Sequence, residues 1–400
     1  DGDPITDAVV AIDETTITYA GRESDSPAQE NRERVDCGGR AVIPGFVDAH
    51  THLVFAGDRS DEFARRLAGE SYSKIAAAGG GILSTVEATR SATEETLFDL
   101  AAKRVWTMIR GGTTTVEIKS GYGHDLETEL RLLRVARRIG DELPVTVRTT
   151  FLGAHSVPAE YRSDRDGYVD LVVNEMLPAA ADHADFCDVF VEDGVFGVDE
   201  ARTIFEAGGA LGLPARVHAE QLSHLGGAAL AAEVGASSAD HLDHVTPDDA
   251  AALAAAGVTC VLVPGAAYTL GTPQPSGRML WDAGCTVALA TDCNPGTSYI
   301  ETMGLVISLG VVQMGLTADE AIWAATRGGA LSLGLENRGQ IKEGSPADLV
   351  VLDAPSPAHI PYRPASNLVQ TVIKDGSVIV GLGPADTART EPPSPARLHE

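Results

Sequence analysis

The sequence predicts an α/β protein: a TIM-like (β/α)8 barrel with a small composite β-sandwich formed by the N- and C-terminal segments. Short apolar runs of strand type alternate with segments of helical spacing, which is typical of a parallel sheet covered on both faces. Eight such runs fall within residues 44–337, enough strands to close a barrel. No G-x-G-x-x-G follows the first run, as it would in an open dinucleotide-binding sheet.

The predicted barrel strands are recognised by the residues at which they end. The first run, AVIPGFVDAH, ends at His50. Helical segments such as 94–110 and 127–140 separate the later runs, and Thr93 and Thr246 are suitable N-caps for two of them. The seven later runs end at Tyr122, His155, Asp193, His218, His241, Pro264 and Asp292.

The two ends of the chain differ from its middle. Residues 1–43 and 338–400 contain short β-type runs separated by Gly and Asp turns. We therefore expect three segments: 1–43 as the first part of the sandwich, 44–337 as the barrel, and 338–400 as the second part of the sandwich with a tail. The Pro-rich end of that tail, EPPSPARLHE, is expected to be exposed to solvent.

Composition limits the classes of partner. The 400 residues are 44% apolar and carry 30 Lys and Arg against 57 Asp and Glu, a net charge of −27. Such a charge repels phosphate backbones and anionic lipids, so we expect no nucleic-acid and no membrane partner.

Only five of the cations are Lys, and excess carboxylate with little Lys suits a very salty cytoplasm. Five Cys without a C-x-x-C, and no apolar leader in DGDPITDAVV, indicate a reducing, cytoplasmic location.

The first predicted strand ends in a pair of histidines, His50 and His52, in the sequence DAHTHL. Residues two apart on a strand share a face, so both imidazoles point the same way. Imidazole is the commonest protein ligand for zinc and iron. The pair alone is a weak signal, because two structural histidines would give the same pattern. Asp48 lies on the same face and is a candidate to orient one imidazole.

Other polar residues fall at equivalent places. His155, His218 and His241 end the third, fifth and sixth predicted strands, and Asp292 ends the eighth. The C-terminal ends of the strands form the rim that holds the active site in this fold. Three imidazoles and one carboxylate leave a coordination position open for water, and a bound divalent ion would polarise a carbonyl and activate that water. The sequence therefore predicts a catalytic metal site.

Several segments between Thr6 and Tyr362 resemble the imidazolonepropionases, which are mononuclear amidohydrolases of histidine degradation. The resemblance implies hydrolysis of the cyclic amide of 4-imidazolone-5-propanoate to N-formimidoyl-L-glutamate, by a homodimer with one divalent metal ion per chain, zinc or iron. The segments are PGFVDAHTHLVFAGDRSDEF, GGGI, TVEIKSGYGHDLETELRLLRVAR, TFLGAHSVP, HAEQ, SADHLDHV and TDCNPGTS.

The same resemblance implies roles for individual residues. His241 would handle a proton or polarise the oxyanion, and Asp292 would pass the water proton to the leaving nitrogen. Gln221 stands where some members carry Glu; an amide there orients and hydrogen-bonds but is no base. The fork of Arg59 suits the propionate. The implied metal ligands are His50, His52, His218 and Asp292, and the implied substrate contacts are Arg59, Tyr72, Tyr122, His155, Gln221, Asn294, Gly296 and Thr297.

Alternatives apply to several of these features. Lys119 could be a carbamylated bridging ligand of a binuclear centre, but that lysine belongs on the fourth strand, where the sequence is VFVEDG. We therefore expect Lys119 to be a cation that either supports the metal ligands from outside or is purely structural, and Cys293 to be a buried filler rather than a nucleophile. A deaminase-type amidohydrolase acting on a purine or pyrimidine would share the metal set but lack Arg59. A catalytically silent assembly subunit would not need four convergent ligands.

Overall fold

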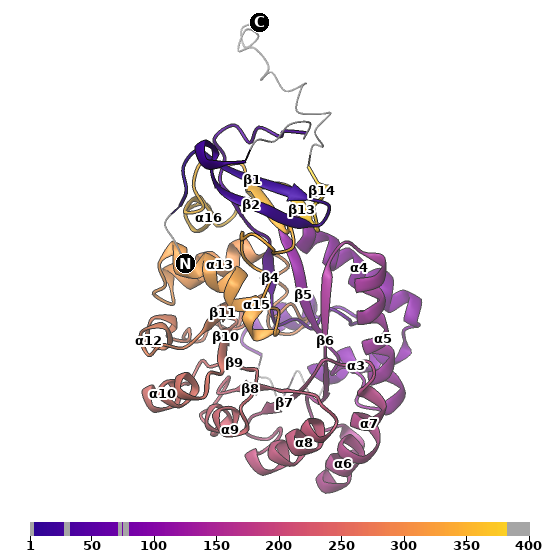
Figure 1. Cartoon of the computed structure of the whole chain (residues 1–400). Coiled ribbons are helices and arrows are strands. Elements are labelled where there is room, and N and C mark those ends of the chain that lie inside the picture. Colours follow the sequence, from indigo (N-terminus) through magenta and orange to yellow (C-terminus); the bar gives the residue numbers. More distant parts are fainter. Residues whose placement is uncertain (1–3, 28–32, 71–73, 75–79, 382–400) are drawn as a thin grey trace, which may run out of the picture.

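The computed structural model describes residues 4–27, 33–70, 74 and 80–381. Eight parallel strands form one sheet that curves into a barrel in chain order, with helices on its outside (Figure 1). The predicted fold class is confirmed. The barrel strands are β4 (Phe46–Asp48), β5 (Thr113–Lys119), β6 (Thr146–Ala154), β7 (Phe186–Val191), β8 (Ala215–Ala219), β9 (Ser238–His241), β10 (Thr259–Leu262) and β11 (Val287–Leu289).

The barrel closes at its C-terminal rim, beyond the last residues of β4 and β11. Thr51 and Cys293 form a parallel bridge there. The Asp292 amide donates to the His50 carbonyl at 3.0 Å, and the His52 amide donates to the Cys293 carbonyl at 3.0 Å. This closure brings the predicted histidine pair next to the predicted aspartate.

Helices cover the outside of the barrel, and two predicted caps are present. Thr93 accepts a hydrogen bond from the Thr96 amide at 3.1 Å, and Thr246 accepts one from the Asp249 amide at 3.3 Å. The α-helices are α1 (Ser60–Leu67), α3 (Ile82–Ser91), α4 (Glu94–Arg110), α5 (Leu126–Glu142), α6 (Arg165–Leu171), α7 (Leu177–Ala180), α8 (Val198–Ala210), α9 (Gly227–Val234), α10 (Pro247–Ala256), α11 (Pro264–Leu270), α12 (Gly277–Asp282), α13 (Met303–Val312), α14 (Ala318–Trp323), α15 (Gly329–Ser332) and α16 (His359–Tyr362). Short 3-10 turns are η1 (Glu23–Asp25) and η2 (Ala159–Tyr161), and π-helical turns are η3 (Val172–Met176) and η4 (Ala324–Gly328).

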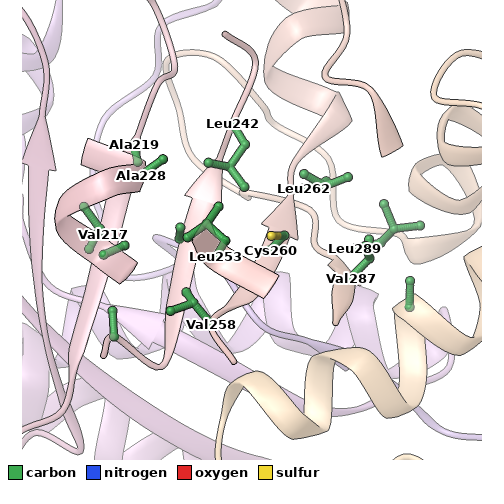
Figure 2. Packing of buried hydrophobic residues seen from close by; sticks show 14 of the residues in the cluster. Val217, Ala219, Ala228, Leu242, Leu253, Val258, Cys260, Leu262, Val287 and Leu289 are labelled. Atoms are coloured by element: carbon green, nitrogen blue, oxygen red, sulfur yellow. The ribbon is translucent and has the colours of Figure 1, made fainter. Parts of the chain in front are cut away.

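The largest core cluster lies between the strands and these helices. Figure 2 shows Val217 of β8, Cys260 of β10 and Leu289 of β11 with Leu253 of α10, all fully buried. Burying one such aliphatic side chain contributes about 1.5–3 kcal/mol. The apolar strand residues that point outward therefore hold the helices on the barrel, which leaves its rim to polar residues.

The terminal segments form separate antiparallel sheets at one end of the barrel (Figure 1). A bridge between Thr16 and Pro346, and a 2.9 Å bond from the Ile17 amide to the Ser345 carbonyl, join the two ends of the chain. The domain boundaries at 43/44 and 337/338 stay a prediction, and the Pro-rich tail lies outside the described residues. The strands are β1 (Ala8–Asp13) and β2 (Thr16–Arg22) in one sheet, and β3 (Val42–Pro44), β12 (Leu349–Leu352), β13 (Val369–Lys374) and β14 (Ser377–Val380) in the other.

Among the described helices, none has both the length and the apolar character needed to cross a bilayer.

Candidate metal centre and active site

The four predicted metal ligands lie together at the C-terminal rim. The Nε2 atoms of His52 and His218 lie 3.4 Å apart. Oδ1 of Asp292 lies 3.5 Å from Nε2 of His50 and 3.5 Å from Nε2 of His52. All four side chains are buried. Strands β4, β8 and β11, or the residues just after them, thus bring three imidazoles and one carboxylate together.

Two neighbouring carboxylates fix the orientation of two imidazoles. Nδ1 of His50 lies 2.6 Å from Asp240, and Nδ1 of His218 lies 3.0 Å from Asp188. Because a carboxylate accepts the Nδ1 proton, each Nε2 keeps its lone pair for a metal. Burial is the main cause that lowers the pKa of His50 and so favours this neutral form.

The donor set fits a divalent cation. Nε2 of His50 is buried and has no hydrogen-bond partner among the described residues. A buried nitrogen without a partner is costly unless something else satisfies it. Two groups of side chains each place their ligand atoms within 4.8 Å of one another: His50, His218 and His241, and His50, His52 and Asp292.

Backbone strain is concentrated at the same rim. Four of the eight non-glycine residues with positive φ in the described part of the chain lie there. This conformation costs free energy and is retained mainly where function requires it. The four residues, with their φ angles, are Glu220 (54°), His241 (78°), Leu242 (63°) and Asp292 (51°).

The prediction for Asp48 is wrong. Its carboxylate does not orient an imidazole but accepts hydrogen bonds from the amide (3.0 Å) and the hydroxyl (2.6 Å) of Thr291. Asp48 thus ties the end of β4 to the end of β11. Burial raises the pKa of Asp48 to about 7. The orienting carboxylates, Asp188 on β7 and Asp240 on β9, were missed by the sequence analysis.

Arg59 lies at the start of α1 and faces the loop after β11. Its guanidinium donates to both carboxylate oxygens of Glu62, at 3.0 and 2.5 Å, and its side chain is only 12% exposed. A Cβ at Gly296 would lie 2.4 Å from Nη1 of Arg59. The structure therefore brings Arg59 and Gly296 together. The guanidinium of Arg59 already has one carboxylate partner within the protein, Glu62.

An aromatic group extends the site from the metal ligands. The ring of His155 stacks on His52 with centroids 5.0 Å apart, and Tyr122 lies 5.3 Å from His155. Nδ1 of His155 lies 2.9 Å from the Gly121 carbonyl, to which it donates. Burial lowers the pKa of His155 to about 3, so the ring is neutral with its Nδ1 used.

The loop after β11 is held by its own asparagine. The side-chain oxygen Oδ1 of Asn294 accepts hydrogen bonds from the backbone amides of Gly296 and Thr297, each at 2.8 Å. The side-chain nitrogen Nδ2 of Asn294 donates to the backbone carbonyl of Asp292 at 2.7 Å. Asn294 therefore shapes the loop that carries Asp292. Tyr72 lies outside the described residues.

The loop after β8 presents Gln221 as a half-buried residue. Its neighbour Glu220 accepts the backbone amides of Leu225, Gly226 and Ala228 at 2.8–3.0 Å. Glu220 is therefore a structural residue of this loop.

Two alternatives from the sequence are resolved by burial and pairing. Nζ of Lys119 is buried 2.9 Å from Glu117 and 2.8 Å from Asp188, so this residue is an ion-paired cation beside the ligands. Cys293 is fully buried, and burial raises the pKa of its thiol, which disfavours the nucleophilic thiolate.

A parallel barrel with convergent histidines and an aspartate at its C-terminal rim defines a metal-dependent amidohydrolase. The chain belongs to the amidohydrolase family, whose family model matches residues 41–379. Proteins from Haloarcula marismortui and Myxococcus xanthus, both named imidazolonepropionase, are each 50% identical to this chain. Each of these alignments covers 93% of this chain and 90% of the relative. Within the amidohydrolases, the chain is therefore a member of the imidazolonepropionase family.

Solved structures share the fold at low identity. The 5-methylcytosine deaminase from Klebsiella pneumoniae, liganded with 5-fluorocytosine, matches with a TM-score of 0.74 at 18% identity over 94% of each chain. The A. niger ochratoxinase matches with a TM-score of 0.70 at 20% identity, over 96% of this chain and 94% of that one. At such identities the likeness shows the fold alone.

Proposed function

We infer that the protein hydrolyses the cyclic amide of 4-imidazolone-5-propanoate to N-formimidoyl-L-glutamate, a step of histidine degradation. The observation that carries this inference is 50% identity, over 93% of the chain, to proteins named imidazolonepropionase. The deaminase alternative has weaker support, since the solved deaminase is only 18% identical to this chain. Arg59 beside the site also suits a substrate that carries a carboxylate.

We propose one divalent ion per chain, zinc or iron, held by His50, His52, His218 and Asp292. The orphaned Nε2 of His50 and the short distances within this set support the assignment. When bound, such an ion polarises a carbonyl and lowers the pKa of water towards neutrality. The imidazole and carboxylate ligands suit both zinc and iron.

The residues around this centre divide the remaining work. Arg59 binds the propionate, and Tyr122 and His155 contact the ring, with Tyr72 as a further contact. Asp292 accepts a proton as water forms the new C–O bond, and it delivers that proton to the ring nitrogen as the C–N bond breaks. His241 stabilises the developing oxyanion.

The loops complete the proposed site. Gln221 orients the substrate through its amide. Asn294, Gly296 and Thr297 hold the end of the substrate that faces the loop after β11.

We also propose that the enzyme is a cytoplasmic homodimer without a nucleic-acid partner. The charge of −27 supports the last point, because it opposes binding to phosphate backbones. Light scattering of the purified protein at two concentrations would give the oligomeric state, and a monomer at both would contradict the proposal.

The function is tested by the ultraviolet loss of imidazolone propionate on adding purified protein. His218→Ala should abolish both metal retention and turnover, because it removes a ligand. The matched control is His359→Ala on α16, whose Nδ1 contacts only the Ser356 carbonyl at 3.1 Å among its described hydrogen bonds. If the wild type leaves the substrate unchanged, the function is wrong. If His218→Ala keeps its metal and its activity, the ligand assignment is wrong.

A further inference from the structure

A cluster of five charged side chains lies in the interior of the barrel, next to the proposed metal ligands. Lys119 of β5 contacts Asp188 of β7 and Asp240 of β9, which lie on strands that do not pair with β5, so these contacts cross the barrel interior. Each of the five side chains is at most 1% exposed. They are Glu117 and Lys119 of β5, Asp188 of β7, Arg216 of β8 and Asp240 of β9.

Lys119 is the member that contacts all three carboxylates. Its Nζ lies 2.8 Å from Oδ2 of Asp188, 2.9 Å from Oε1 of Glu117 and 3.6 Å from Oδ2 of Asp240. Arg216 supports the same site from another side, since its Nη2 lies 3.3 Å from Oδ2 of Asp240. Lys119 thus links the carboxylates that contact two imidazoles.

The two aspartates of this cluster are shared with the metal site. Oδ1 of Asp188 accepts a hydrogen bond from Nδ1 of His218, while Oδ2 of Asp188 accepts one from Nζ of Lys119. Oδ2 of Asp240 accepts hydrogen bonds from Nδ1 of His50 and from Nη2 of Arg216. Each aspartate is therefore held between a buried cation and an imidazole.

We propose that Lys119 is a positioning residue for the metal centre, acting through Asp188 and Asp240 on His218 and His50. A buried carboxylate needs donors for its remaining lone pairs, and the ammonium of Lys119 supplies three. With three carboxylates and two cations the cluster carries one net negative charge; without Lys119 it would carry two. Asp188 and Asp240 would then each lose a contact with the cation that holds the carboxylate beside its imidazole. This inference rests on the metal role proposed for these histidines.

A purely stabilising role is the competing explanation, and the chain offers a matched control for it. Lys374 of β13 is also buried and ion-paired, with Asp348 at 3.1 Å and Asp375 at 2.5 Å. That cluster belongs to the small terminal sheet. A change at Lys374 should therefore lower stability as a change at Lys119 does, without reaching the histidines.

The test compares Lys119→Met with Lys374→Met as metal-free proteins titrated with Co²⁺ against a competing chelator. We expect Lys119→Met to weaken Co²⁺ binding about 10- to 100-fold, the usual effect of outer-shell changes, and to alter the visible absorption of the bound ion. Lys374→Met should lower the melting temperature but keep affinity and spectrum. The proposal is overturned if Lys119→Met binds Co²⁺ within twofold of wild type with the same spectrum.

A double-variant cycle tests whether Lys119 acts through Asp188. The combined loss of affinity in Lys119→Met with Asp188→Asn should be smaller than the product of the two single losses; independent losses would overturn the proposal. If Lys119→Met does not fold, Lys119→Gln, which also removes the charge, is compared with Lys374→Gln by the same affinity criterion. Turnover of imidazolone propionate by wild type is measured in parallel. Wild type that binds Co²⁺ without turnover would refute the proposed function and leave this inference standing.

Discussion

Arg59→Met removes a guanidinium whose surroundings are well defined. Methionine keeps an unbranched, uncharged stem but loses the guanidinium that donates to Glu62 and packs on Gly296. If the fork also binds the propionate, the loss is that of a charge-assisted pair, about 1.5–3 kcal/mol. At 1.36 kcal/mol per tenfold, kcat/KM should fall about 10- to 150-fold.

The assay uses two compounds and one control variant. The compounds are imidazolone propionate and an analogue whose side-chain carboxylate is replaced by a neutral group. Wild type and Arg59→Met should process the analogue almost equally, because the partner charge is gone. The control, Glu62→Gln, keeps Arg59 but weakens its internal ion pair, so it should lose less on imidazolone propionate than Arg59→Met does.

Two results would refute this reasoning. If Arg59→Met loses the same factor on both compounds, the residue does not recognise the carboxylate. If Glu62→Gln matches the loss of Arg59→Met, Arg59 acts by holding α1 and the backbone of Gly81, whose amide donates to Glu62 at 2.8 Å.

Three further predictions concern metal, salt and pH. Elemental analysis should give one tightly held ion per chain, and two would contradict the assigned ligand set. The melting temperature should rise between low salt and several-molar KCl, because the Debye length falls from about 10 Å at 0.1 M to about 3 Å at 1 M and screens the −27 charge; an unchanged or lower value would count against this. The hydrogen bond to Asp249 is the main cause that raises the pKa of His224 in the folded protein. The stabilisation of the folded state by this bond is therefore present below pH 6.5, the pKa of an unfolded histidine, and is lost as the pH rises through the raised pKa of the folded protein. In His224→Gln the melting temperature should vary less with pH between about pH 6 and 8 than in the wild type. An unchanged dependence on pH would show that other groups cause it.

The metal ligands could be predicted because the fold makes their spacing meaningful. In a parallel barrel every strand ends at the same rim, so His218 and Asp292 both lie next to the histidine pair although 74 positions separate them. The two-residue repeat of a strand predicted that His50 and His52 share a face; both rings lie at the site, although β4 ends before them at Asp48. These arguments need only the order and direction of the strands.

The outer shell could not be predicted in this way. Asp48 was predicted to share a face with the histidine pair, yet Thr291, just after β11, donates to both of its carboxylate oxygens. Asp188 and Asp240 belong to other strands, and their partners depend on how far each strand is shifted along the barrel. One sequence does not fix that shift, so pairs across the interior stayed hidden.

The charged interior of this barrel also separates function from stability. The interior of such barrels is usually packed with branched apolar side chains. Buried ion pairs cost desolvation, and apolar replacements of similar volume are often as stable or more stable. Lys119, Glu117 and Arg216 are therefore poorly explained by folding alone. Lys119 and Arg216 contact the carboxylates that accept the Nδ1 protons of His50 and His218, and Glu117 pairs with Lys119. These contacts give a direct reason for the cluster, since the imidazoles must keep their Nε2 atoms directed at the metal site.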